Sequence, residues 1–228
     1  MKLKLTDRKT ESPGVESFIF KPQEPLQWKA GQYLHYVLNH APTDDRGSDR
    51  WFTIASAPFE EHVMLTTRFA AERGSTFKKA LQALKPGDAI EVSDLDGDFV
   101  VDDPKQPCVF LAGGIGITPF HSILKQMEHD GQPLRVTLLY SNRETVAAYK
   151  DEFDAMTKRN PNLKVHYLSH PQRIDRDTIQ KLVPDLKQPF FYVSGPEPMT
   201  ESLGKLLLEM GVPKSRIKQD WFPGYPAE

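Results

Sequence analysis

Cysteine is almost missing from this sequence, which has a single one, Cys108, in 228 residues. One thiol excludes a disulfide within the chain, and it excludes a zinc or iron–sulfur centre held by several cysteines of the chain. Cys108 stands inside an apolar run, so we expect it to be an inert buried thiol. We predict no metal site.

The sequence also lacks long hydrophobic runs and a marked excess of charge of either sign. No apolar stretch approaches the length of a membrane span, and the N-terminal residues alternate without forming the apolar core of a signal peptide. The formal net charge of -2 gives no indication of a nucleic-acid binder. We therefore expect a cytoplasmic protein with no membrane span and no nucleic-acid partner, long enough for one large or two small domains.

What the sequence does have is a glycine-rich stretch that follows Cys108. The apolar run Val109–Ala112 ends in three glycines within four residues, and Thr118 and Pro119 then suit the start of a helix. Apolar residues recur behind them with helical spacing. This pattern predicts a buried strand, a tight turn and a helix whose free N–H groups favour a phosphate. Pro119 replaces the third glycine of the usual dinucleotide motif, so the turn does not by itself name the ligand.

The first hundred residues read as short strands separated by turn signals. We expect strands near residues 3–5, 15–20, 33–38, 50–56, 62–69 and 89–92, with one helix that begins at Ser75. Many short strands of this kind predict an antiparallel β-barrel or sandwich.

A polar segment with two prolines, residues 102–107, separates this pattern from a different one. We therefore predict two domains, residues 1–102 and residues 103–228. In the second, strands near 109–112, 135–140, 164–168, 190–193 and 217–220 alternate with helices that begin near Thr118, Glu144, Asp175 and Pro196. Such alternation predicts an α/β doubly wound parallel sheet, with ligands at the carboxyl ends of its strands.

Four motifs together resemble the ferredoxin–NADP reductase-like flavoproteins, which have an FAD-binding barrel followed by a nicotinamide-nucleotide domain. The match covers essentially the whole chain, and the motifs occur in the family's order. Arg50-Trp51-Phe52-Thr53 resembles Arg-x-Tyr-Ser, and Gly74-Ser75-Thr76 resembles the glycine and serine that open a helix in the second FAD motif. Gly113–Pro119 is similar to Gly-Gly-x-Gly-x-Thr-Pro, and Ser194–Met199 to Cys-Gly-Pro-x-x-Met with serine for cysteine.

The resemblance implies an FAD site in the first domain. Arg50 would bind the pyrophosphate, Phe52 would cover the flavin in place of a tyrosine, and the Thr53 hydroxyl would lie near flavin N5. The remaining expected FAD contacts are Trp51, Thr66, Arg68, Gly74, Ser75, Thr76, Thr118 and Phe222. Ordinary structural roles stay open: a salt-bridged surface arginine, a core phenylalanine, a strand threonine and a helix N-cap. FMN in place of FAD would leave Gly74–Thr76 without a function.

The resemblance also implies a nicotinamide-nucleotide site in the second domain. Its expected contacts are Gly114, Gly116, Thr118, Arg143, Ser169, Gly195, Pro196 and Met199, with Met199 packing behind the site. Ser194 stands where many relatives have a cysteine beside the transferred hydride. The strand near 164–168 ends in Ser169-His170, where NADH-preferring relatives carry an acid, and Arg143 and Arg173 would suit a 2′-phosphate, so NADPH is favoured over NADH. Both arginines also fit ordinary surface charges.

The C-terminal stretch is aromatic, and plant-type members of the family end in a glutamate followed two residues later by a tyrosine that covers the flavin. Asp220 and Phe222 keep that spacing, so we expect Phe222 or Trp221 to lie near the flavin. A last strand with buried apolar residues is the alternative. With Thr53 and Ser194, Asp220 completes the expected catalytic residues.

These implications predict an FAD-dependent NAD(P)H oxidoreductase. Hydride would pass from NADPH, or NADH, to FAD, and single electrons would pass on to a separate acceptor such as a ferredoxin, a flavodoxin or an oxygenase component. No general acid–base pair is required, so histidines such as His121 are interpreted as structural. Two alternatives remain: a flavin reductase that uses flavin as a substrate, and a non-catalytic nucleotide-binding regulatory subunit.

Overall fold

The computed structural model describes residues 1–69 and 74–222, and the described chain divides into two compact units. The first contains Met1–Val100 together with His121–Gln126, and the second contains Val101–Phe120 and the chain from Met127 onward. The division between the units thus falls two residues before the predicted boundary. Six residues of the helix after the glycine turn belong to the first unit.

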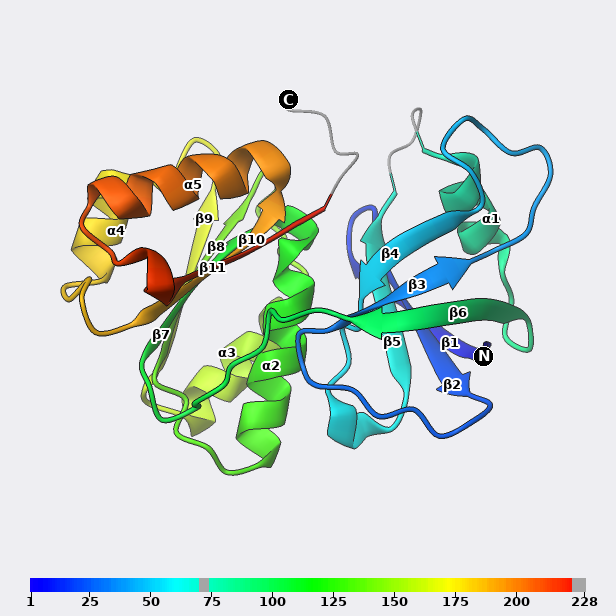
Figure 1. Ribbon diagram of the computed structural model, residues 1–228, viewed down its shortest axis with the longest axis horizontal. Coiled ribbons are helices and arrows are strands. Elements are labelled where there is room, and N and C mark those ends of the chain that lie inside the picture. Colours follow the sequence, from blue (N-terminus) through cyan, green and yellow to red (C-terminus); the bar gives the residue numbers. More distant parts are fainter. Residues whose placement is uncertain (70–73, 223–228) are drawn as a thin grey trace. The chain divides into compact units, whose positions relative to one another are not determined.

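The first unit is a curled antiparallel sheet of six strands in the order β4-β3-β6-β1-β2-β5 (Figure 1). The strands are β1 Lys2–Ser12, β2 Val15–Pro22, β3 Tyr33–Val37, β4 Asp49–Thr53, β5 Val63–Arg68 and β6 Ala89–Asp96. Helix α1 spans Thr76–Ala83, and a short 3-10 turn, η1, spans Pro58–Glu60. This architecture confirms the predicted antiparallel barrel domain.

Alternation of side chains decides which face of this sheet is buried. Leu3 and Leu5 of β1, Phe18 and Phe20 of β2, and Leu34 and Tyr36 of β3 all enter one hydrophobic core. The amphipathic helix α1 contributes Phe77 and Leu81 to the same core. The core therefore extends from the sheet to α1, next to the motif Arg50–Thr53.

The second unit is a parallel sheet of five strands in the order β11-β10-β7-β8-β9. The strands are β7 Cys108–Gly113, β8 Val136–Asn142, β9 Leu163–Ser169, β10 Phe190–Pro196 and β11 Ile217–Phe222. The helices are α2 Thr118–His129, α3 Lys150–Arg159, α4 Arg176–Leu182 and α5 Glu197–Glu209, with 3-10 turns η2 Gly114–Ile117 and η3 Lys214–Arg216.

Helices cover both faces of this parallel sheet (Figure 1). On one face, Val109, Leu111 and Val193 pack with residues of α4 and α5. On the other face, Phe110 stacks on Phe120 in the first turn of α2, with ring centroids 4.6 Å apart. This two-sided arrangement confirms the predicted doubly wound α/β fold.

Two local predictions were wrong. The helix expected near Glu144 begins at Lys150. Tyr149, the residue before it, has the left-handed φ of 61°, so a helix cannot continue through this position. Thr118 is not an N-cap: its backbone is helical, and its hydroxyl donates to the carbonyl of Ile115 at 3.1 Å. The turn η2 starts the helical path before Thr118 is reached, which removes the need for a cap there.

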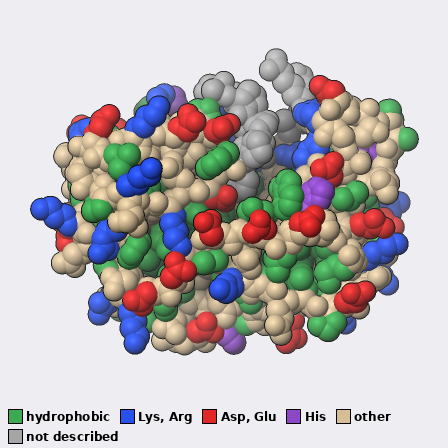
Figure 2. All heavy atoms as spheres, in the orientation of Figure 1, with side chains coloured by type: hydrophobic (Ala, Val, Ile, Leu, Met, Phe, Trp, Pro, Cys, Tyr) green, Lys and Arg blue, Asp and Glu red, His purple; other side chains and the backbone are tan. Residues whose placement is uncertain are grey.

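Charges of both signs are interspersed over the visible surface (Figure 2), in keeping with the small net charge of -2. Among the helices of the described residues, none has the length and apolar character that crossing a bilayer requires.

Candidate active site

Arg50 lies on β4 beside the first turn of α1. Its guanidinium is over the ring of Phe77, 5.4 Å from the centroid. Nη1 donates to the backbone carbonyls of Arg46, at 2.6 Å, and of Asp49. Nη2 is buried and has no hydrogen-bond partner among the described residues. A cation with an unused buried donor suits an anionic ligand, as the motif predicts.

The start of α1 is already supplied with oxygen acceptors from the chain itself. Ser75 is a conventional N-cap whose hydroxyl accepts from the N–H of Lys78 at 3.2 Å. The N–H of Thr76 donates to the carboxylate of Asp44 at 2.9 Å. That bond, helped by Arg46, lowers the pKa of Asp44 to about 2. The Thr76 N–H predicted for a phosphate is therefore held by an internal carboxylate.

Thr53 ends β4 in a buried position. It is 4% exposed, and its hydroxyl has no partner within the part of the chain that the structure describes. Buried polar groups in folded proteins are nearly always hydrogen-bonded, so this hydroxyl is available to a ligand at the motif position. Phe52 is half-buried and packs on Tyr36 and Phe77, with ring centroids 5.7 and 6.0 Å away, as a core aromatic would.

The structure does not bring every predicted FAD contact together. Trp51 points to the opposite face of β4 from Arg50, is 47% exposed and stacks on His35 with ring centroids 4.6 Å apart. The hydroxyl of Thr66 is hydrogen-bonded to that of Ser17 at 2.7 Å across β2 and β5. Arg68 contributes its backbone carbonyl to Lys78 at 2.8 Å. Gly74 directly precedes the Ser75 cap.

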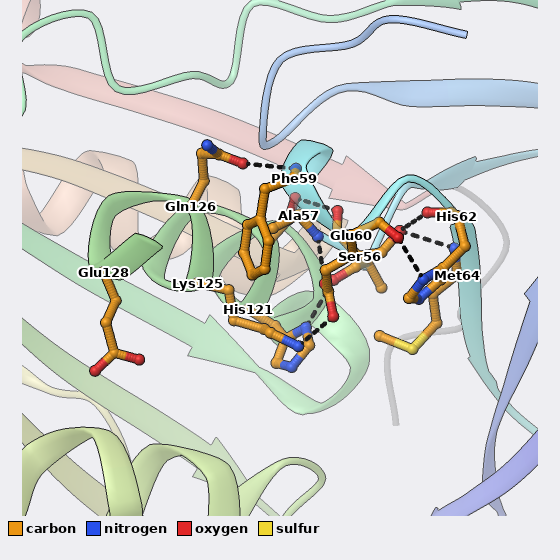
Figure 3. A network of polar contacts seen from close by, with 12 residues as sticks. Ser56, Ala57, Phe59, Glu60, His62, Met64, His121, Lys125, Gln126 and Glu128 are labelled. Carbon is orange, nitrogen blue, oxygen red and sulfur yellow. Dashed lines mark hydrogen bonds and ion pairs between the residues drawn. The ribbon is translucent and has the colours of Figure 1, made fainter. Parts of the chain in front are cut away.

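The segment after Thr53 is held in place by residues of α2 (Figure 3). His121 Nδ1 donates to the carbonyl of Ala55 at 2.6 Å, and the Ser122 hydroxyl donates to the carbonyl of Ser56 at 2.6 Å. All four residues are at most 1% exposed. This contact agrees with the interpretation of His121 as a structural residue. Its partner, 66 positions away, could not be predicted from the local sequence.

The predicted nucleotide site lies where β7 and β10 are neighbours and the strand order reverses. The two conspicuous glycines here serve different purposes. A Cβ at Gly116 would lie 2.3 Å from the carbonyl oxygen of Ser194, so this glycine permits close packing against β10. Gly114 has φ +53°, and a Cβ there would meet no described atom within 4 Å. Of these two glycines, Gly114 is the one whose backbone is open to a ligand.

Because of the register of the parallel sheet, the other residues predicted for the nucleotide site also lie at the carboxyl ends of its strands. Ser194 pairs with Ala112 on one side and with Asp220 on the other. Ser194 is 0% exposed, and its hydroxyl is unpartnered within the described ranges. Gly195 and Pro196 follow it and lead into α5. Met199 packs behind the turn, because its sulfur would lie 2.2 Å from a Cβ at Gly113.

The ends of β8 and β9 carry the residues predicted to select NADPH. Asn142 at the end of β8 pairs with Ser169 at the end of β9, and the Ser169 hydroxyl donates to the carbonyl of Glu144 at 3.5 Å. Arg143 directly follows Asn142 and is exposed. In β11, Trp221 is 52% exposed, so the alternative of a buried last strand does not hold for it. The side chain of Phe222 lies outside what the structure describes, and the tail prediction stays a prediction.

Comparison with known proteins agrees with this geometry. Residues 110–205 match the model of the oxidoreductase NAD-binding domain. A flavohemoprotein of Rhodopirellula baltica is 26% identical over 244 residues, which cover 96% of this chain and 59% of the relative. These similarities agree with the predicted likeness to the ferredoxin–NADP reductase-like oxidoreductases. The comparisons support the predicted family, enzyme class and cofactor classes, a flavin and a nicotinamide nucleotide.

Solved structures share the fold of this chain over 97% of its length. The flavohem-like FAD/NAD binding domain of nitric oxide dioxygenase from Vibrio cholerae superposes with a TM-score of 0.83 at 20% identity, covering 97% of this chain and 98% of that one. Ferredoxin-NADP+ reductase from Plasmodium falciparum superposes with a TM-score of 0.80 at 18% identity, covering 97% and 95%. The chain spans less than two thirds of the flavohemoprotein that it matches.

Proposed function

We propose that this chain is an FAD-dependent NAD(P)H oxidoreductase that passes electrons to an acceptor outside the residues described above. Four buried hydroxyls have no hydrogen-bond partner in the described chain, those of Tyr36, Thr53, Thr67 and Ser194, and the observation that carries the proposal is that Thr53 and Ser194 both stand at motif positions. Thr53 is the last residue of β4, and Ser194 lies in the buried stretch of β10; both stand at motif positions. An unpaired buried hydroxyl costs stability, so two at such positions favour ligands that complete them.

The flavin, when bound, supplies hydride acceptance and single-electron transfer, and the chain's residues bind and orient. Arg50 has a buried Nη2 donor available for phosphate, and Thr53 supplies a hydroxyl at the predicted flavin ring. Gly114 leaves open space for the nucleotide, while Gly116 keeps β10 close enough to place Ser194 at the same edge. Alignment of the two rings is the main task of the protein in this reaction.

The preference for NADPH is part of the proposal. The exposed Arg143 follows β8 at the edge where Ser169 ends β9, and no acidic residue stands at the end of either strand. Cations suit a 2′-phosphate, whereas a ribose hydroxyl is usually met by an acid. Turnover should be faster with NADPH than with NADH at subsaturating concentration. Equal or better use of NADH would contradict this assignment.

A separate electron-acceptor protein completes the proposed reaction, such as a ferredoxin, a flavodoxin or an oxygenase component. The relatives that extend well beyond the matched region leave a second source open, a further domain of the same polypeptide. Reduction assays with each class of acceptor at equal concentration distinguish them, since a protein partner saturates at micromolar levels while an unspecific dye does not.

A flavin reductase that exchanges its flavin is a second candidate, and one observation favours it. Asp44 occupies the Thr76 N–H that the motif predicts for the FAD pyrophosphate. An anion must displace this carboxylate to use that donor, which weakens binding of a permanent cofactor.

A visible spectrum followed by anaerobic addition of NADPH tests these functions. A yellow protein that bleaches supports a resident flavin, and a colourless protein that reduces added flavin supports the exchange of flavin. Absence of both flavin binding and turnover would refute the enzyme and leave a nucleotide-binding subunit.

A further inference from the structure

The loop between β3 and β4 places two oxygen acceptors on the two groups predicted to bind the FAD pyrophosphate. We name residues 44–46 of this loop the strap. The strap's Asp44 carboxylate accepts from the N–H of Thr76 at 2.9 Å, and its Arg46 carbonyl accepts from Arg50 Nη1 at 2.6 Å. The helix start and the arginine are near each other, because the Arg50 guanidinium lies over Phe77, the residue after Thr76.

The contacts of Asp44 are those that a bound phosphate oxygen would make. One carboxylate oxygen accepts from the backbone N–H of Thr76 and from the Arg46 guanidinium, the latter at 2.7 Å, and the other accepts from the Arg46 N–H at 3.1 Å. A backbone donor at a helix start and a guanidinium form a typical anion site. The carboxylate is ionised at neutral pH, since its pKa is about 2.

A second set of bonds aligns the strap with α1. The N–H of Asp44 donates to the Thr76 hydroxyl at 3.0 Å. His40 Nδ1 donates to the carbonyl of Leu38 at 2.7 Å, and its Nε2 is hydrogen-bonded to the Thr76 hydroxyl at 2.9 Å. The cap from Ser75 to Lys78 is independent of the strap. The strap can therefore leave without removing the cap of α1.

We propose that the strap is an internal competitor for the flavin's phosphates and that Asp44 sets the affinity for them. This inference rests on the proposed function, because it needs a flavin at Arg50. Asp44 and a phosphate cannot both take the Thr76 N–H, and two anions cannot share this site without repulsion. The phosphates of FAD bind only when the strap leaves the Thr76 N–H. The difference in affinity between FAD and a flavin without phosphate is therefore smaller than Arg50 and α1 would give without the strap.

Titration of flavins into the flavin-free full chain tests the proposal by quenching of flavin fluorescence. Asp44→Asn and Asp44→Ala should each lower the Kd for FAD roughly tenfold, the effect of losing a competing charge-assisted hydrogen bond. The Kd for riboflavin, which has no phosphate, should change less than about twofold. Asp45→Asn is the matched control, because it removes the same charge one position away, and it should bind FAD as the unmodified protein does.

Two variants are used at position 44 so that an effect on FAD binding can be separated from a loss of structure. The asparagine keeps a neutral oxygen near Thr76, and circular dichroism with thermal melting shows whether α1 remains. An FAD Kd that is unchanged or higher in Asp44→Asn, in a protein that melts normally and binds FAD, would overturn the strap proposal and leave the proposed function standing. Failure of the unmodified chain and of both variants to bind any flavin would refute the two together.

Discussion

Alanine at Gly116 should damage the fold, whereas alanine at Gly114 should damage nucleotide binding. A Cβ at Gly116 would lie 2.3 Å from the Ser194 carbonyl oxygen and 2.6 Å from the Gly195 Cα, where ordinary contacts begin at 3.4 Å. Both neighbours are backbone atoms of β10, so the strand must move, at a cost of about 3 kcal/mol. Gly114 has φ +53° with no described atom near its Cβ, and alanine there costs only about 1 kcal/mol.

Urea unfolding of both variants, with NADPH affinity measured by calorimetry, tests this reasoning. Gly131→Ala is the matched control, since Gly131 has φ +64° and equally open surroundings among the described residues, in the loop after α2. It should lose about 1 kcal/mol of stability, like Gly114→Ala, but keep its NADPH affinity. A Gly116→Ala protein as stable as Gly114→Ala would refute the packing argument. Normal NADPH affinity in Gly114→Ala would refute the placement of the nucleotide.

Three further predictions concern single side chains. Thr53→Val removes an orphaned hydroxyl and should stabilise the flavin-free protein by about 1 kcal/mol in urea, whereas Ser122→Ala, which loses a 2.6 Å bond to Ser56, should destabilise it by a similar amount; the reverse order would contradict the hydrogen-bond assignment. Burial raises the pKa of Cys108 from 9.0 to about 12, so its stabilising contribution is complete below pH 9 and is lost as the pH rises toward 12; Cys108→Ala should show a flatter alkaline decline in melting temperature, and parallel curves would count against it. The low pKa of Asp44 gives stability that is present above pH 4 and lost as the pH falls toward 2. The free energy of unfolding of Asp44→Asn should therefore fall less between pH 4 and pH 2 than that of the unmodified protein, and an equal fall in both would argue against the Thr76 bond.

The elements that could be predicted from sequence are those whose burial repeats with a regular period. Leu3 and Leu5 alternate with lysines and lie in the first core, and Leu203 and Leu207 of α5 share the second core. The glycine turn and the alternating strands and helices led to the correct doubly wound sheet, because strand–turn–helix units are local in sequence. The ordered motifs led for the same reason to a family likeness that the comparisons support.

The features that were missed depend on contacts between distant positions. Asp44 reaches Thr76 across 32 positions, and nothing in its polar loop distinguishes it from Asp45. The late start of α3 depends on a left-handed Tyr149, a conformation that a bulky residue rarely adopts. Gly114 and Gly116 look equivalent in sequence, and only the position of β10 separates open backbone from close packing.

The assignment of residues 121–126 to the first unit limits how the protein can be dissected. A fragment that ends at residue 102 would hold every strand of the antiparallel sheet, yet it would lose the side chains that bind Ala55 and Ser56. Two buried carbonyls would lose their donors, and the segment that follows Thr53 would be uncovered. A version of the first unit prepared for study, or exchanged between homologues, therefore has to carry the helix that the glycine turn introduces, so the two units are not separate modules along the chain.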